Sequence, residues 1–241
     1  MTQASPALEL HTLCTLFYFI AAAYAGDNPE PLVTDRPDIA ESSLAVGKGV
    51  YQLEQGVSLS GAAGQAASVG FPSLSRLGLG GNVELRLETP IVAISDGGVG
   101  FDGLALGGKW HLPLQGPSLG ILAHAELVPG GQVAPILKLA GDFDLPAGLE
   151  LGINAGGTTA GGLEAPTGLW AVAMGRSVTD ALRLYVEGSG DARLDGAAAT
   201  VAVDGGFSYL ISNDVQWDMS ALYGVVGGGW GAGTGISSRF D

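Results

Sequence analysis

Apolar and polar residues alternate with a period of two along most of this chain. In residues 215–223 every second residue is apolar, and Gln216, Asp218 and Ser220 fall between them. Because successive side chains of a strand point to opposite faces, this pattern predicts a strand with one apolar and one polar face. Two structures fit it. In a soluble sandwich the apolar face meets a second sheet, whereas in an outer-membrane barrel it meets lipid and the polar face lines the lumen.

Turn residues divide the chain after Gly49 into about twelve candidate strands. Ten alternate clearly: residues 50–60, 83–91, 104–112, 119–128, 137–145, 149–155, 182–188, 200–210, 215–223 and 230–240. Residues 69–77 alternate weakly, and residues 169–176 are apolar on both faces.

The connections between these segments are sorted by length. Short turns such as 146–148 and 211–214 alternate with longer, glycine-rich loops such as 92–102 and 156–167. Outer-membrane barrels have short periplasmic turns and longer external loops, while a sandwich has no reason to sort its loops. We therefore predict an all-β fold, a transmembrane antiparallel β-barrel of about 12 strands with an N-terminal periplasmic extension.

The N-terminus has the features of an export signal. Residues 13–23 form an apolar run that ends in Ala23-Tyr24-Ala25, a cleavage site of the A-x-A type. A short membrane anchor is the alternative, although the run is shorter than the ~20 residues that a spanning helix needs. We predict a signal peptide at residues 1–25, a lead-in at 26–48 and a barrel at 49–241. Cys14 is the only cysteine, so the mature chain would have neither disulfide nor thiol.

Composition narrows the range of functions that the chain could have. The formal net charge of −14 argues against nucleic-acid binding, which needs clustered Lys and Arg. Only 14% of residues are charged and 41 are glycine, which suits a sheet protein with apolar residues facing something other than water. An acidic lumen would favour cations or neutral solutes over anions.

Charged residues and histidines recur on the polar faces of the candidate strands. The predicted lumen-lining residues are Glu84, Arg86, Glu88, Lys109, His111, His124, Glu126, Lys138, Asp142, Arg183, Glu187, Asp204, Asp218 and Arg239, and the same face is assigned to Asp144, Glu150 and Arg176. These groups could pair across neighbouring strands and hold a narrow lumen together. They could also form a solute path, and both roles can hold at once.

Catalytic and metal-binding chemistry find little support. His124 and Glu126 share a face, with His111 on the neighbouring strand, but no serine shares that face of residues 119–128. A nucleophile needs a base within hydrogen-bond reach and a third group to orient it. The glycines at 227–229 lack the Gly-Lys-Ser/Thr of a phosphate loop. We predict no catalytic residue, no metal site and no cofactor.

Several motifs resemble one protein family. The opening reads Leu32-Val33-Thr34-Asp35-Arg36-Pro37-Asp38, then Glu41-Ser42-Ser43 and Gln52-Leu53-Glu54-Gln55-Gly56; further stretches are Leu106-Gly107-Gly108-Lys109-Trp110 and Ile236-Ser237-Ser238-Arg239-Phe240. They resemble an outer-membrane transporter family labelled "meta-pathway of phenol degradation", over nearly all of the mature chain. The resemblance implies a barrel loosely related to channels for hydrophobic solutes.

The two ends of the mature chain carry further expectations. The family's lead-in would begin in the periplasm, where Asp35, Arg36 and Asp38 either enter the lumen as a plug or belong to a disordered tether. Phe240, next to last in the chain, resembles the C-terminal signal that barrel-insertion machinery recognises, although Asp241 follows it.

These observations favour a monomeric channel in a Gram-negative outer membrane, surrounded by lipid, that passes small solutes of unknown identity, aromatic or hydrophobic ones among them. A non-transporting structural or surface-interaction barrel is the alternative from another class. A soluble periplasmic sandwich is the third.

Overall fold

The computed structural model describes residues 30–90, 93–95, 98–100, 103–127, 132–159, 166–196 and 198–240. The expected signal peptide and the first residues of the lead-in lie outside this range. Within the described ranges, no helix has both the length and the apolar character needed to cross a bilayer.

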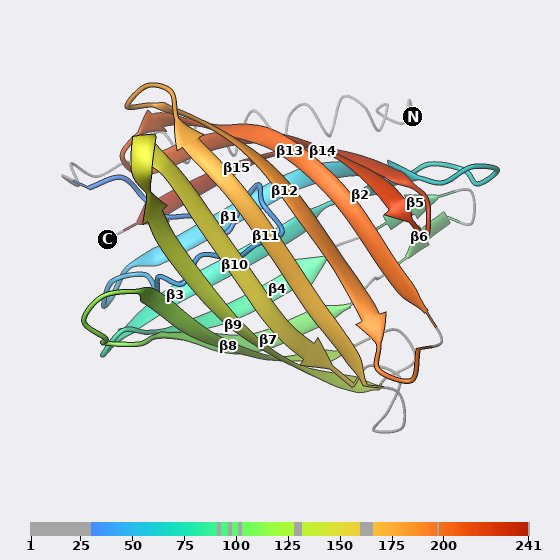
Figure 1. The fold of residues 1–241 in the computed structure, drawn as a ribbon, viewed down its shortest axis with the longest axis horizontal. Coiled ribbons are helices and arrows are strands. Elements are labelled where there is room, and N and C mark those ends of the chain that lie inside the picture. The colour runs from blue at the N-terminus through green and yellow to red at the C-terminus, as the bar shows by residue number, and fades with distance from the viewer. Residues whose placement is uncertain are drawn as a thin grey trace, which may run out of the picture.

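Twelve long strands form a closed antiparallel barrel (Figure 1). They are β1 (Tyr51–Gly61), β3 (Pro72–Gly80), β4 (Val83–Pro90), β7 (Leu104–His111), β8 (Ser118–Leu127), β9 (Val133–Leu145), β10 (Leu149–Thr158), β11 (Thr167–Ser177), β12 (Leu182–Arg193), β13 (Ala199–Ser212), β14 (Val215–Val226) and β15 (Trp230–Phe240). Each pairs with the next along the chain, and β15 pairs with β1 to close the ring. The predicted all-β barrel of about twelve strands is confirmed.

The structure differs from the predicted boundaries in strand length and in short elements. Some strands extend into the expected loops: β9 begins at Val133 rather than Leu137, and β12 ends at Arg193 rather than Gly188. The loop expected at 92–102 contains two short strands, β5 (Ala93–Ser95) and β6 (Gly98–Gly100), and β2 (Ser68–Gly70) precedes β3. The turn at 146–148 is a 3-10 turn, η1 (Pro146–Gly148), with Ala147 at φ 65° and Gly148 at φ 69°.

Strand β11 explains why residues 169–176 looked apolar on both faces. Its inward residues are Ala171, Ala173 and Gly175, all buried, while Trp170 and Met174 point outward. The inner face is therefore lined with small side chains rather than polar ones. Ala171 and Ala173 pack with Ala40, which comes from the lead-in.

The barrel is apolar outside and polar inside. On β14, Trp217 and Tyr223 are 38% and 64% exposed, whereas Asp218 between them is fully buried. A soluble protein would not present so many large apolar side chains to water, but lipid accepts them. The largest fully buried side chains include Arg76, Arg86 and Lys109, so a charged interior replaces the usual apolar core.

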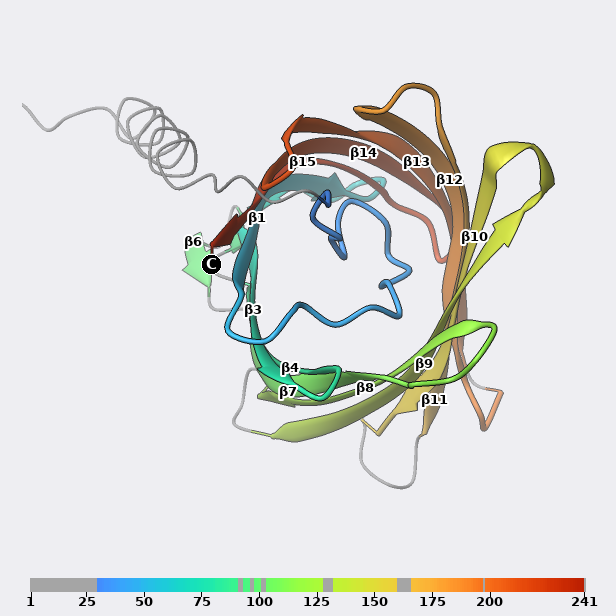
Figure 2. The same cartoon turned by 90° about the vertical axis from the view of Figure 1, so that its left-hand side faces the viewer.

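The lead-in lies inside the ring of strands (Figure 2, blue trace). Leu32, Asp35, Glu41 and Ser43 are all buried there. The backbone amide of Leu32 donates to the carbonyl of Asn213 at 2.7 Å, next to the short turn between β13 and β14. The described part of the lead-in therefore enters from the end of the barrel that carries the short turns.

Candidate functional site

Three cations line one wall of the lumen, on adjacent strands. Arg76 of β3 stands directly opposite Arg86 of β4, and Lys109 of β7 stands opposite Glu84 of β4. Like charges in directly opposed positions destabilise a sheet unless acids separate them. This wall therefore needs carboxylates close to its guanidinium and ammonium groups.

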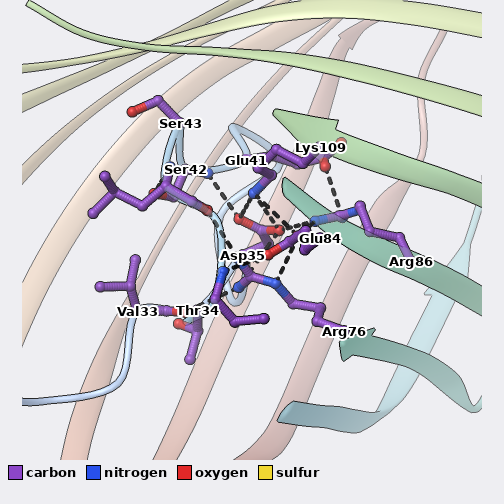
Figure 3. A network of polar contacts seen from close by, with 12 residues as sticks. Val33, Thr34, Asp35, Glu41, Ser42, Ser43, Arg76, Glu84, Arg86 and Lys109 are labelled. Carbon is purple, nitrogen blue, oxygen red and sulfur yellow. Dashed lines mark hydrogen bonds and ion pairs between the residues drawn. The ribbon is translucent and has the colours of Figure 1, made fainter. Parts of the chain in front are cut away.

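Asp35 of the lead-in supplies one of these carboxylates (Figure 3). It accepts hydrogen bonds from Lys109 Nζ at 2.9 and 2.8 Å and from Arg86 Nη1, and it lies 3.7 Å from Arg76 Nη1. Burial by itself would raise the pKa of Asp35, but Arg76, Lys109 and Arg86 together hold that pKa well below its usual value. The carboxylate is ionised and bridges all three cations.

Wall acids complete the cluster. Arg76 donates to Glu54 at 3.1 Å and to both oxygens of Glu84 at 3.0 and 2.9 Å, and Arg86 also donates to Glu84 at 3.0 Å. The three cations are thus matched by Glu54, Glu84 and Asp35. Buried charges are tolerated when they are paired and hydrogen-bonded in this way.

Glu41 forms the second charged contact of the lead-in. Arg86 Nη2 donates to it at 2.8 Å and Lys138 Nζ donates to its other oxygen. Burial raises the pKa of Glu41, and the charges of Arg86 and Lys138 outweigh this and lower it. Glu41, Glu88 and His124 offer ligand atoms within 4.8 Å of one another, but Arg86 and Lys138 already compensate these carboxylates. We assign no metal site to this group.

Wall side chains on the far side of the lumen bind the backbone of the lead-in. Glu187 of β12 accepts the amide hydrogens of Ile39 and Ala40, both at 2.7 Å. Asn154 of β10 accepts from the amide of Glu41 at 2.8 Å and donates to its carbonyl at 2.9 Å. These contacts satisfy backbone groups that the lead-in, having no sheet partner, would otherwise leave unpaired.

Charged and polar side chains hold two further points of the lead-in. Asp38 pairs with Arg183 at 3.2 Å, and Arg183 also donates to Glu150 at 2.8 Å. Asp142 accepts from the amide of Ser43 at 2.8 Å. Burial raises the pKa of Asp38 to about 6 despite the opposing charge of Arg183.

The structure places the predicted lumen residues on the inner face of the wall. Ten of them contact the lead-in directly: Glu84, Arg86, Lys109, His111, Lys138, Asp142, Arg183, Glu187, Asp218 and Arg239. The other four lie elsewhere on the wall: Glu88 is 3.2 Å from His124, Asp204 stands opposite Glu187, and Glu126 stands opposite Ala105.

One of the charged residues assigned to the inner face was placed wrongly. Arg176 is exposed near the end of β11 and shares its face with the outward Val172 and Met174. Because the inner face of β11 carries no polar side chains, alternation could not show which face of this strand Arg176 lies on.

Sequence reasoning also missed Arg76, the central cation. It lies in the weakly alternating segment 69–77, because β3 carries Leu74 on its inner face and Ser75 on its outer face. Glu54, Gln52 and Asn154 were likewise not singled out, and all three are buried against the lead-in. An inward Arg directly opposite Arg86 is visible only once the β3–β4 register is known.

No Ser–His–acid chain forms at the histidines within the described structure. His111 Nδ1 faces the carbonyl oxygen of Ser43 at 3.3 Å, while the hydroxyl of Ser43 is bound to Asp142 and to Ser118, each at 2.7 Å. A catalytic serine must instead give its proton to the histidine.

Comparison with known proteins places the chain in a family. Residues 34–240 match the family described as "Putative MetA-pathway of phenol degradation". No curated protein matches the sequence. Among solved structures, the NanC porin is similar with a TM-score of 0.60 and 9% identity, covering 77% of this chain and 98% of the porin.

A second similar structure is the COG4313 outer membrane channel from Pseudomonas putida F1. Its TM-score is 0.58 at 12% identity, covering 82% of this chain and 98% of the channel. At these identities the likeness concerns the fold, which is that of outer-membrane barrels. This chain is an outer-membrane β-barrel of Gram-negative type and belongs to the "Putative MetA-pathway of phenol degradation" family.

Proposed function

We propose that this protein is a channel through which small solutes cross the outer membrane by diffusion, in a lumen narrowed by the lead-in. The observation that supports it most directly is the path of the lead-in (Figure 2). It is held along the wall from β14 to β4, β12, β10 and β9, with cavities left beside it. In this role Asp35, Arg36 and Asp38 belong to a constriction.

One cavity beside the lead-in supports a choice of solute. It has a volume of about 270 Å³ and is lined by Ile39 of the lead-in and by a mainly apolar stretch of wall that includes Leu169, Ala171 and Leu222, together with the polar or charged Lys138, Asn154, Ser189 and Asp191. A surface that is apolar with a few polar groups suits small aromatic or aliphatic solutes that carry a hydroxyl or amide. A second cavity, of about 290 Å³, is lined by charged side chains such as Asp35, Arg36 and Glu54 and gives no support for an apolar solute.

Lumen charge supports exclusion of anions. The chain carries 24 Asp and Glu residues against 10 Lys and Arg, a formal net charge of −14. Because the polar side chains of the strands face the lumen, this acidic excess gives the lumen a negative potential that would repel anionic solutes.

We further propose a non-enzymatic monomer, surrounded by lipid, in which Phe240 near the end of β15 guides insertion by the barrel-insertion machinery.

Solute entry into liposomes tests the proposal. Purified protein in phospholipid vesicles should admit phenol-sized neutral solutes faster than benzoate or other small anions, measured by osmotic swelling. Vesicles containing the boiled protein are the control. Equal swelling with and without folded barrel would overturn the channel proposal.

A non-transporting structural barrel is the second candidate, favoured by the many contacts that fix the lead-in inside the lumen. If the barrel is purely structural, vesicles that contain the intact protein should be no more permeable to solutes than empty vesicles. A chain lacking residues 30–46 separates the two: a barrel that becomes permeable only after this deletion is closed in its intact form.

A further inference from the structure

One pairing in the barrel differs from all the others. Strands β1 and β15, the first and last, pair over their full lengths from Tyr51 opposite Phe240 to Gly61 opposite Trp230. The other long strands pair with neighbours in sequence, whereas this pair joins the two ends of the barrel sequence. Its formation carries the largest loop-closure cost in the fold. We call this β1–β15 pair the seam.

Two glycines face each other across the seam. Gly56 of β1 stands opposite Gly235 of β15, and Gly235 in turn stands opposite Asp218 of β14. The three residues form a row across three strands, and Gly235 and Asp218 are buried on the inner face. Where two side chains would normally project, the row leaves a hollow beside a carboxylate.

The side chain of Arg36 fills this hollow. Its Nη2 and Nε donate to the two oxygens of Asp218 at 3.0 and 3.3 Å. A methyl group added at Gly56 would lie 2.7 Å from Nη2 and 2.8 Å from Cζ of Arg36. One added at Gly235 would lie 2.5 Å from Nε. The guanidinium therefore packs on bare backbone of both seam strands, in the two-pronged geometry that arginine forms with carboxylates.

Neighbouring residues of the lead-in also contact the strands at the seam. Gln52 of β1 donates to the carbonyl of Val33 at 2.9 Å, and Gln216 of β14 donates to the hydroxyl of Thr34 at 2.9 Å. Arg239 of β15 donates to the carbonyl of Glu30 at 2.7 Å. Residues 30–36 thus touch β14, β15 and β1 in a single stretch.

We propose that residues 30–36 are an internal clasp of the seam, with Arg36 as the group that occupies a guanidinium niche. Because Gly56 and Gly235 come from the two ends of the barrel, the niche exists only when β1 and β15 are paired. Closure builds the niche, and by linkage its occupation stabilises closure. The clasp does not depend on transport, since it concerns how the barrel stays shut.

Gly56→Ala tests the niche without removing a charge. In the full chain, folded into detergent micelles, this substitution should raise the rate of unfolding in urea at least about tenfold. The rate is measured from the loss of the folded barrel's distinct electrophoretic mobility, which boiling abolishes. Gly233→Ala is the matched control, because its added methyl would meet its nearest atoms at 3.5 Å, an ordinary contact. It should change the rate less than threefold.

A double-mutant cycle separates the clasp from local strain. The three atoms nearest to a methyl group at Gly56 all belong to Arg36. Gly56→Ala should therefore have almost no effect on the unfolding rate in an Arg36→Ala background. If the two substitutions acted independently, their effects on the rate would multiply. Equal effects of Gly56→Ala in both backgrounds would overturn the proposal.

A disulfide across the seam then tests whether Arg36 stabilises the β1–β15 pairing. Leu59 and Ala232 stand opposite each other there, so Leu59→Cys with Ala232→Cys, in a chain with Cys14→Ser, would close the seam by a disulfide. Once oxidised, this lock should suppress the faster unfolding of Arg36→Ala. A corresponding disulfide between β9 and β10, made by Leu139→Cys with Ala155→Cys, should leave the faster unfolding of Arg36→Ala unchanged. Equal suppression by both locks, or by neither, would contradict the clasp.

Discussion

The carboxylate of Asp35 accepts hydrogen bonds from Lys109 Nζ through both of its oxygens, at 2.9 and 2.8 Å, although 74 positions separate the two residues. Lys109 belongs to the barrel wall and Asp35 to the lead-in. The wall places Arg76 directly opposite Arg86, and Asp35 joins the wall acids in compensating the two positive charges. Barrel and lead-in are therefore one electrostatic unit.

Asp35→Asn should release the lead-in from this wall. The substitution keeps the shape of the side chain but removes the negative charge that bridges Arg76, Arg86 and Lys109. Removing one partner of a buried ion pair costs about 3–5 kcal/mol, so the urea midpoint should fall and protease should cut the lead-in more readily. Asp144→Asn, at an exposed position near the end of β9, is the control. Equal protection of the lead-in in both variants would contradict this account.

Arg76 and Arg176 should differ sharply in their contribution to the free energy of unfolding. Arg76 is fully buried and makes contacts with Glu54, Glu84 and the carbonyls of Val33 and Leu44. Arg76→Ala should lower the free energy of unfolding by about 3–5 kcal/mol, because it orphans buried acids. Arg176→Ala, on the outer face, should change it by less than about 0.5 kcal/mol. Urea titration of both variants checks the contrast.

The pH dependence of stability should contain a contribution from Asp38. Its pKa in the folded protein is raised to about 6 by burial, above the ordinary value of 3.8. A raised carboxyl pKa means that the folded state binds the proton more tightly. The stability contributed by Asp38 is therefore greatest below about pH 4 and declines as the pH rises through 6, by on the order of 3 kcal/mol.

Asp38→Asn removes this titration. Plotted against pH, the difference in unfolding free energy between the native chain and the variant should fall between pH 4 and 6 in favour of the variant, then level off. A difference that is flat across this range would show that Asp38 does not titrate there.

Glu187→Gln should loosen one segment of the lead-in. Glu187 accepts the amide hydrogens of both Ile39 and Ala40, and an amide side chain offers one acceptor oxygen in place of two. A hydrogen bond contributes about 0.5–1.5 kcal/mol, so exchange of these two amides with deuterium should quicken roughly twofold to tenfold. Glu126→Gln, a lumen position on β8, is the control. Unchanged exchange at Ile39 and Ala40 would contradict the assigned contact.

Alternation and loop lengths, together with the export signal, predicted a membrane barrel of about twelve strands. The period of two on β14 carries that information locally, since Trp217 and Asp218 must point to opposite sides of any strand. The same rule correctly predicted inward positions for Arg86, Lys109 and Glu187. It failed for Arg176, because Ala171 and Ala173 made the inner face of β11 indistinguishable from an outer one.

Tertiary structure decided which charges meet. Period-two alternation gives the face of a residue but not its height in the lumen or its neighbour across the sheet, so Arg76 remained unnoticed until the register placed it opposite Arg86. Asp35 and Arg36 are adjacent in sequence, yet Asp35 reaches β7 while Arg36 reaches β14. Local sequence determined a two-faced wall, because side-chain direction is a property of each strand. Where the lead-in binds depended on closure of the ring, which brings the two ends of the barrel sequence together at one niche.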